Sequence, residues 1–274
     1  MRCTRMPSLI QVEHLVKRYS GRRVPGSGEG TSALNDVSFS LAPGRTLALV
    51  GESGSGKSTL ALCLAGLERP TSGRIWFGGR DIVALDEKEL RTVRPQIQLV
   101  FQDPVSSLNP RFTTLEILRE PLIVQRSGGR RETRERALAM LESVGLSREM
   151  ASRGPGEFSG GQRQRLAIAR ALSLAPKLVI LDEALSALDC SVQAQIANLL
   201  LELQSSFALT YLFITHDLAM AAHLGDEIAV MDRGRVVEQG VPEKILRAPE
   251  QEATRRLVAA IPGSSVTPRL PRAL

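Results

Sequence analysis

A glycine-rich stretch near residue 50 has the residue types that hold the phosphates of a nucleotide. Gly51, Gly56, Lys57 and Ser58 fit the spacing G-x-x-x-x-G-K-[ST] between a short apolar run and a helix-forming stretch. Glycine lets backbone amides point at a phosphate, lysine neutralises phosphate charge, and a serine hydroxyl can ligate Mg²⁺. The alternative is an ordinary glycine turn, but four fixed positions rarely coincide by chance. We therefore expect a nucleotide site built from Gly51, Glu52, Ser53, Gly54, Ser55, Gly56, Lys57, Ser58 and Thr59.

Two adjacent carboxylates, Asp182 and Glu183, follow the apolar run Leu178–Leu181. Acids at the end of a buried strand cost free energy unless a cation or a catalytic task awaits them. We expect Asp182 to hold Mg²⁺, directly or through water, and Glu183 to act as the general base on the attacking water. The alternative is a pair of solvated acids that a helix N-terminus would favour.

Two single residues after apolar strands could complete this chemistry. His216 follows the apolar run Thr210–Thr215, where it could sense the γ-phosphate by hydrogen-bonding the phosphate or the water. A lone histidine at the end of a strand is otherwise most often structural. Gln102 follows another strand and could reach the metal or the water, although by itself it is a weak signal.

The segment Phe158–Gln162, FSGGQ, offers a second anion site. Ser159, Gly160, Gly161 and Gln162 precede a helix-forming stretch, and amides at a helix start favour anions. The alternative is that Ser159 simply caps the helix. One copy of the chain already has a phosphate loop, so a surplus anion site suggests that two such chains face each other.

Short apolar runs and amphipathic stretches predict the elements that position these residues. A buried strand should lead into the phosphate loop, with a helix over Lys57–Leu67 after it. From about Thr113 to Leu172 strand signals vanish, which predicts an inserted helical subdomain; Ala137, Leu138, Leu141 and Val144 share one helix face there. We expect a further helix over Ser191–Gln204 and strands over Leu9–Leu15, Val37–Leu41, Thr46–Gly51, Arg74–Gly79, Ile97–Phe101, Leu178–Glu183, Thr210–His216 and on both sides of the turn Asp232–Gly234.

Composition places the chain among ordinary globular proteins. Its 274 residues are 43% hydrophobic and 23% charged, with no apolar run of the length that a membrane span needs and no signal-peptide core. We therefore expect a soluble, cytoplasmic chain with one large domain over 1–261, a mobile loop over 21–31 and a disordered tail over 262–274. The net charge of +6 comes from scattered arginines without a basic run, which predicts a solvated surface and no nucleic-acid partner.

At these motifs the chain resembles the ATP-binding-cassette ATPases, over Leu9–Ala248. The resemblance implies an α/β fold, a P-loop NTPase with a RecA-like core, an antiparallel β subdomain and the inserted helical subdomain. It implies that two subunits sandwich two ATPs with Mg²⁺ and that Tyr19 stacks on adenine. The signature residues Ser159–Gln162 would clamp the γ-phosphate on the partner chain, Asp189 would couple the two sites, and Gln102 would sense the membrane partner.

Within this family, FSGGQRQR and FQDPVSSLNP resemble the branch that imports oligopeptides, dipeptides and nickel. Phe158 and Ala184 stand where the family usually has leucine and proline, and neither position carries a catalytic atom. ILDEALSALD, RIWFGG and FITHDL most resemble the nickel-importer ATP-binding subunit. The alternative within the branch is a dipeptide or oligopeptide importer.

The resemblance also implies partners and a location. They are a second ATPase subunit (typically a distinct sister chain), two membrane permeases and, indirectly, an extracytoplasmic binding protein. The chain would lie peripherally on the cytoplasmic face of the inner membrane. Nickel itself should not touch the chain, because its three histidines and three cysteines are scattered.

Three other classes of ATPase or GTPase compete with this interpretation. An ATPase of the same fold that acts on DNA or ribosomes usually needs a coiled-coil or zinc insertion or two cassettes, and the sequence shows none of these. An exporter or lipid-release cassette is disfavoured only by FQDPVSSLNP. A GTP-binding switch would need an N-K-x-D motif, which the sequence lacks.

Overall fold

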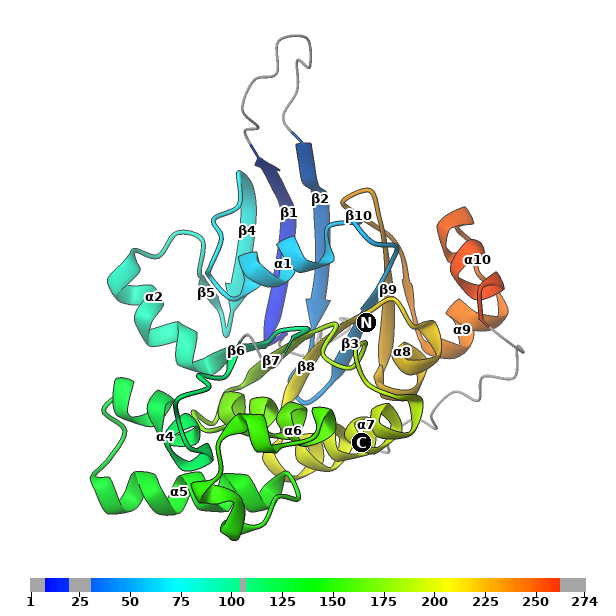
Figure 1. Cartoon of the computed structure of the whole chain (residues 1–274). Coiled ribbons are helices and arrows are strands. Elements are labelled where there is room, and N and C mark those ends of the chain that lie inside the picture. The colour runs from blue at the N-terminus through cyan, green and yellow to red at the C-terminus, as the bar shows by residue number, and fades with distance from the viewer. Residues whose placement is uncertain (1–7, 20–30, 104–106, 262–274) are drawn as a thin grey trace, which may run out of the picture. The chain divides into compact units, whose positions relative to one another are not determined.

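The computed structural model describes residues 8–19, 31–103 and 107–261. The chain divides into two compact units (Figure 1). We call the first the terminal unit, since it holds the chain up to Val93 and from Thr210 onward, and the second the inserted unit, Arg94–Leu209. The predictions for the tail and for residues 21–30 of the loop concern residues outside those described.

An antiparallel sheet forms one part of the terminal unit. Its strand order is β2-β1-β4-β5, with β1 at Ile10–Tyr19, β2 at Thr31–Leu41, β4 at Ser72–Phe77 and β5 at Arg80–Asp81. Strand β1 continues past the predicted end at Leu15, because a register shift near His14, whose φ is 49°, lets pairing with β2 resume.

The second set of strands in the terminal unit carries the phosphate loop. Strands β3 (Thr46–Val50) and β8 (Thr210–Thr215) are parallel neighbours and fully buried, as their unbroken apolar sequence predicts. Strand β9 (Glu227–Asp232) pairs with the other edge of β3, and β10 (Arg235–Gly240) returns antiparallel to it. The two-residue turn Arg233–Gly234 between them has positive φ at both residues, so the predicted hairpin is confirmed.

Helix α1 in the terminal unit (Lys57–Leu64) ends before the predicted Leu67. Gly66 has a φ of 65°, and its amide and that of Leu67 donate to Cys63 and Leu62, which is the Schellman pattern of a helix end. The other helices were not predicted; they are α2 (Glu87–Val93), α8 (Leu218–Leu224), α9 (Pro242–Arg247) and α10 (Glu252–Ala259).

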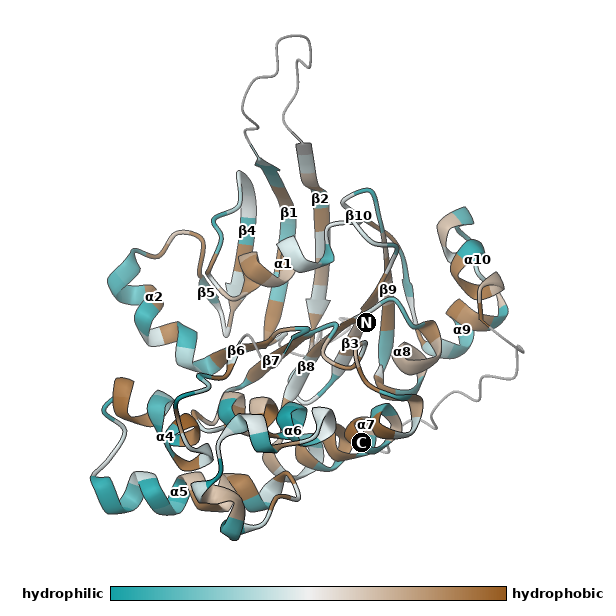
Figure 2. Cartoon of the chain, viewed as in Figure 1, coloured by the Kyte–Doolittle hydropathy of each residue, from teal (hydrophilic) through white to brown (hydrophobic). Residues whose placement is uncertain are grey.

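The inserted unit contains the predicted helices. They are α4 (Thr114–Val124), α5 (Arg130–Ser143), α6 (Gly160–Leu172) and α7 (Cys190–Phe207), with short 3₁₀ turns at Arg94–Gln96, Arg148–Ser152 and Pro155–Glu157. The predicted apolar face of α5 is buried, and Figure 2 shows hydrophilic residues over the first half of this helix. The unit also holds the parallel pair β6 (Ile97–Val100) and β7 (Leu178–Asp182), so it is larger than the helical subdomain about 113–172, whose limits stay a prediction.

Among the described residues, the helices lack the combination of length and apolar character that would let one cross a membrane.

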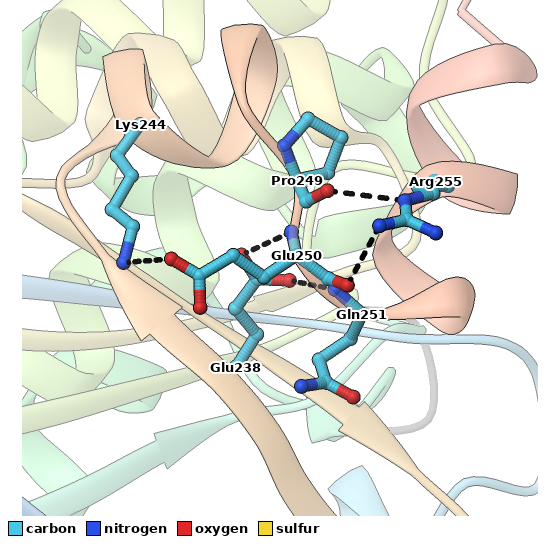
Figure 3. A network of polar contacts seen from close by, with 6 residues as sticks. All are labelled: Glu238, Lys244, Pro249, Glu250, Gln251 and Arg255. Atoms are coloured by element: carbon cyan, nitrogen blue, oxygen red, sulfur yellow. Dashed lines mark hydrogen bonds and ion pairs between the residues drawn. The ribbon is translucent and has the colours of Figure 1, made fainter.

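A buried carboxylate fastens α10 to β10 (Figure 3). Glu238 is 7% exposed, and its two carboxylate oxygens accept hydrogen bonds from the amides of Glu250 and Gln251, at 3.0 Å each. Burial by itself raises the pKa of Glu238, but the Thr254 hydroxyl, these amides and the Lys244 charge outweigh it, so the pKa lies below its ordinary value of 4.5. The contacts at the start of α10 therefore favour the charged carboxylate.

This arrangement predicts that replacing Glu238 with Gln destabilises the protein by about 1–3 kcal/mol at neutral pH. Because the folded-state pKa is lowered, the stabilisation is complete above the unfolded-state pKa and is lost as pH falls through the folded-state value. Chemical denaturation at several pH values should show a smaller loss of stability on acidification for E238Q than for the wild type. The matched control is E243Q, which changes an exposed glutamate of α9; an equal effect of both variants would contradict the role of Glu238.

Candidate functional site

The phosphate loop is shaped by close approach of neighbouring backbone. A Cβ atom at Gly51 would lie 2.2 Å from the carbonyl oxygen of Met231 on β9. A Cβ atom at Gly56 would lie 2.3 Å from the Ala33 carbonyl oxygen, and Gly56 also has a φ of 107°. Glycine is therefore required at both motif positions, for steric reasons that the motif alone does not reveal.

Lys57 occupies the centre of this loop. Its side chain is buried, and its ammonium donates to the carbonyl oxygens of Gly51 at 2.7 Å and Glu52 at 2.9 Å. Gly56 caps α1 and offers no side chain to the first amides of the helix. The loop thus places a cation and helix-terminal amides together, which is the environment that an anion prefers.

The other predicted members of the loop differ in exposure. Glu52, Ser53, Gly54 and Ser58 are exposed, Thr59 is half-buried, and Ser55 is buried. An exposed hydroxyl at Ser58 fits its predicted role as a metal ligand.

The loop is also braced by the predicted turn Asp232–Gly234, through a contact that the sequence did not predict. The Gly234 amide donates to the Ser55 carbonyl at 2.9 Å, and the Gly234 carbonyl accepts from the Asn35 amide at 2.8 Å. Arg256 of α10 also lies near Glu52, with Nε 3.8 Å from Oε1. The D-x-G sequence of the turn was the available signal, but its contact with the phosphate loop depends on tertiary structure.

The structure brings His216 close to the phosphate loop. Strands β3 and β8 are in parallel register with Val50 opposite Thr215, so the loop and His216 leave the same edge of the sheet. His216 is exposed, and the next residue, Asp217, caps α8 by accepting from the amides of Ala219 and Met220. The exposed position at this edge is compatible with the predicted contact to the γ-phosphate, and the role of His216 stays a prediction.

The packing of Gly51 makes a sharp prediction. In G51A the new methyl group would collide with the Met231 carbonyl, so β9 or the loop must shift, and we expect MgATP affinity to fall at least about tenfold. Isothermal titration calorimetry would measure the affinity. The matched control is G129A, where the added Cβ meets nothing within 4 Å and φ is −77°. Wild-type affinity in G51A would show that the close approach does not shape the site.

Tyr19 ends β1 in the same unit, with 39% of its surface exposed. The ammonium of Lys17 lies 4.9 Å from the centre of the tyrosine ring. An exposed aromatic ring in this position can stack on a flat base.

In the inserted unit, the two predicted carboxylates stand at the end of β7. Asp182 is 9% exposed, and Glu183 is half-buried. Glu183 has a φ of 47°, a left-handed conformation that costs energy for a non-glycine residue and is often found where function demands it.

Gln102 lies beside this turn through a residue that sequence reasoning missed. Its Nε2 atom donates to the Ser186 hydroxyl at 3.4 Å, and that hydroxyl donates to the Glu183 carbonyl at 2.9 Å. Gln102 is exposed, and these two hydrogen bonds connect it to the backbone carbonyl of Glu183. Ser186 gave no separate sequence signal because serine is common in turns.

The signature residues form a helix cap. The Ser159 hydroxyl accepts from the Gln162 amide at 3.3 Å, while Gln162 Oε1 accepts from the Ser159 amide at 3.0 Å. The N-cap alternative is therefore confirmed as the local geometry of α6. The hydroxyl hydrogen of Ser159 can still be donated to an anion. The role of these residues on a second chain stays a prediction.

The glycines of the signature have a packing role as well. A Cβ at Gly161 would lie 2.7 Å from Val192 Cγ1 on α7, and one at Gly160 would lie 3.5 Å from Leu188 Cδ2. Close approach of α7 therefore demands glycine at position 161.

Three other predicted positions lie in the same unit. Asp189 is the exposed N-cap of α7, and its carboxylate does not cap that helix. The two departures from the family pattern, Phe158 and Ala184, are buried with 4% and 2% exposure. Their hydrophobic side chains therefore serve packing.

The predicted donors for Mg²⁺ are oxygen atoms throughout. They belong to the Ser58 hydroxyl, the Asp182 carboxylate and the Gln102 amide, which are the hard ligands that Mg²⁺ prefers. Within the described ranges, no group of three or more histidine, cysteine or acidic side chains could hold a metal ion on its own.

Comparison with known proteins agrees with these features. The family model described as ABC transporter matches residues 34–186. The chain is 49% identical over 261 residues to a probable peptide ABC transporter ATP-binding protein, y4tS, of Sinorhizobium fredii, covering 93% of this chain and 73% of that protein. It is 46% identical over 255 residues to the dipeptide transport ATP-binding protein DppF of Escherichia coli, covering 93% and 76%.

Two further comparisons differ in how much of the relative is covered. The oligopeptide transport ATP-binding protein OppD of Mycobacterium tuberculosis is 49% identical over 261 residues, but the chain spans only 42% of its length. A solved dimeric ATP-binding cassette, MJ0796, in a post-hydrolysis state with ADP and Pi, matches with a TM-score of 0.75 at 32% identity, covering 85% of this chain and 98% of that one. The P-loop NTPase fold of an ABC cassette is thereby confirmed, and this chain belongs to the ABC transporter family as one of its ATP-binding cassettes.

Proposed function

We propose that this chain is the ATP-hydrolysing subunit of an importer and that it drives uptake of a dipeptide or oligopeptide through separate membrane subunits. The observation that carries the proposal is the phosphate loop with Lys57 buried against the Gly51 and Glu52 carbonyls. Its likeness to peptide transporter ATP-binding proteins over 93% of the chain supports the choice of cargo class.

The residues of the loop divide the work on ATP. Lys57 exchanges its two loop carbonyls for the β- and γ-phosphate oxygens when ATP enters. Ser58, Gln102 and Asp182 would hold Mg²⁺, which would neutralise negative charge on the phosphates. Tyr19 stacks on adenine.

Two residues act on the attacking water and the phosphate in this proposal. Glu183 accepts a proton from the water, and His216 hydrogen-bonds the γ-phosphate. Gln102 reports on the occupied site to the membrane partner.

A second ATPase chain completes the site in this proposal. Ser159–Gln162 of one chain donate to the γ-phosphate held by the other, and Asp189 couples the two sites. ATP then closes the pair, and hydrolysis with phosphate release opens it, because only the ATP-bound state makes these contacts. The partner is a distinct sister chain, and both lie against two permeases on the cytoplasmic face of the membrane.

The cargo is the point at which the sequence prediction and the relatives diverge. Short motifs favoured nickel, whereas the relatives described above are named for peptides. Identity over about 260 residues outweighs a resemblance of a few residues, so we propose peptide and make nickel an outcome of the test. An ATPase that acts on nucleic acid gains no support from these relatives.

Whole-cell uptake can decide the cargo. A strain that lacks the gene would be complemented with the wild type, and uptake of a radiolabelled dipeptide and of radioactive nickel would be measured side by side. We expect complementation to restore dipeptide uptake and leave nickel uptake unchanged. Restoration of nickel uptake alone would overturn the peptide assignment, and restoration of neither would overturn both.

A further inference from the structure

Lys17 is held by three contacts in the terminal unit. Its ammonium forms an ion pair with Glu68 and donates to the Arg69 carbonyl at 2.7 Å. The ring centre of Tyr19 lies 4.9 Å away, within the range of a cation–π contact. The Lys17 side chain is 11% exposed, so this cation is largely shielded from water.

These contacts can use all three N–H donors of the Lys17 ammonium. Two of its three N–H groups serve Glu68 and Arg69, and the third can point at the aromatic face. The Glu68 carboxylate raises the pKa of Lys17 above its ordinary value, so the lysine stays charged at any physiological pH.

The turn Glu68–Thr71, which supplies the Glu68 and Arg69 partners of Lys17, also fixes the backbone next to Tyr19. The Thr71 amide donates to the Val16 carbonyl at 2.7 Å, and the Arg18 amide donates to the Thr71 hydroxyl at 2.9 Å. This turn follows α1, the helix that begins in the phosphate loop. The end of β1 is thus tied to the element that carries the phosphate site.

We propose that Lys17 is a positioning residue for the nucleotide base: it holds the Tyr19 ring in the orientation that stacks on adenine, and it affects ATP only through that ring. This inference rests on the proposed function, in which Tyr19 stacks on adenine. The two residues lie two positions apart in VKRYS, and their side chains meet even though the register of β1 against β2 shifts between Lys17 and Arg18.

The experiment measures binding of MgATP and of magnesium tripolyphosphate, which has no base, to the full chain by calorimetry. We expect K17M to weaken MgATP binding about 2- to 5-fold, the range that loss of one cation–π contact gives, and to leave tripolyphosphate binding unchanged. Y19A should weaken MgATP about tenfold, as loss of a base stack does. Y19F, which keeps the ring, should stay within about twofold of the wild type.

The double variant K17M/Y19A tests whether Lys17 affects MgATP binding only through the Tyr19 ring. In the Y19A background, K17M should have no further effect on MgATP, and K17R should retain most of the wild-type affinity. K244M is the matched control, since it removes another lysine that pairs with a glutamate in the same unit at 2.7 Å, and it should bind both ligands like the wild type.

Four outcomes would overturn the proposal. They differ in whether they also contradict the adenine stack or the proposed function. An unchanged MgATP affinity in K17M beside a weakened Y19A removes only the role of Lys17. Equal weakening of ATP and tripolyphosphate by K17M would mean that Lys17 acts through the phosphate loop. Wild-type affinity in Y19A removes the adenine stack, and failure of the wild type to bind MgATP removes the proposed function itself.

Discussion

Replacing Glu183 with Gln is expected to reduce ATP turnover by about 10²- to 10⁴-fold while MgATP binding stays within about twofold of the wild type. The amide has the shape of the carboxylate but cannot accept a proton from water. Glu183 occupies a left-handed turn whose carbonyl is held by Ser186, so the backbone should keep its conformation in the variant. Phosphate release, measured in the complex with its partners, gives the turnover, and calorimetry gives the binding.

The matched control for this prediction is E202Q, the same chemical change at an exposed position on α7 of the same unit. It should hydrolyse ATP like the wild type. Near-normal hydrolysis in E183Q would refute the assignment of the general base, whereas loss of MgATP binding would mean that Glu183 serves the metal.

Replacing Lys57 with Met is expected to cause a large loss of MgATP affinity. The variant loses the cation that faces the phosphates, and hydrogen bonds to charged groups contribute about 1.5–3 kcal/mol each. MgATP affinity should therefore fall about 10²-fold, with a corresponding loss of hydrolysis. The carbonyls of Gly51 and Glu52 also lose their donor, so a modest decrease in melting temperature should accompany it.

Lys88, an exposed lysine on α2, provides the control, because K88M removes the same charge from the same unit. The MgATP affinity of K88M should match that of the wild type. K57R tests whether charge alone suffices, and we expect it to bind MgATP weakly because a planar guanidinium does not reproduce the compact ammonium that donates to the two carbonyls. A K57M chain that binds MgATP normally would show that the phosphates lie elsewhere.

Much of the site could be predicted from local sequence, since its chemistry depends on residues close together in the chain. The G-x-x-x-x-G-K-S spacing and the acids after an apolar strand are such patterns, and the structure places both at strand ends. The reasons for the glycines could not be predicted, because Gly51 is constrained by Met231 and Gly161 by Val192, far along the chain. Both contacts exist only after folding.

The elements of the fold also divide into those that local sequence predicts and those that depend on tertiary contacts. Buried strands such as β3 and β8 are visible as apolar runs, because both faces are covered. Helix α10 was missed, because it is short and is held by Glu238 of β10. The end of α1 was misplaced by three residues, although Gly66 was the available stop signal.

The most direct test of the central claim is ATP-dependent transport by the complete transporter in vesicles. Wild-type and E183Q complexes would be supplied with MgATP on the side that this chain faces, and labelled dipeptide carried across the membrane would be measured together with phosphate released. We predict that the wild type couples the two and that E183Q loses both, while K88M keeps both. Transport that continues without ATP or with E183Q would contradict the claim that hydrolysis at this site drives uptake.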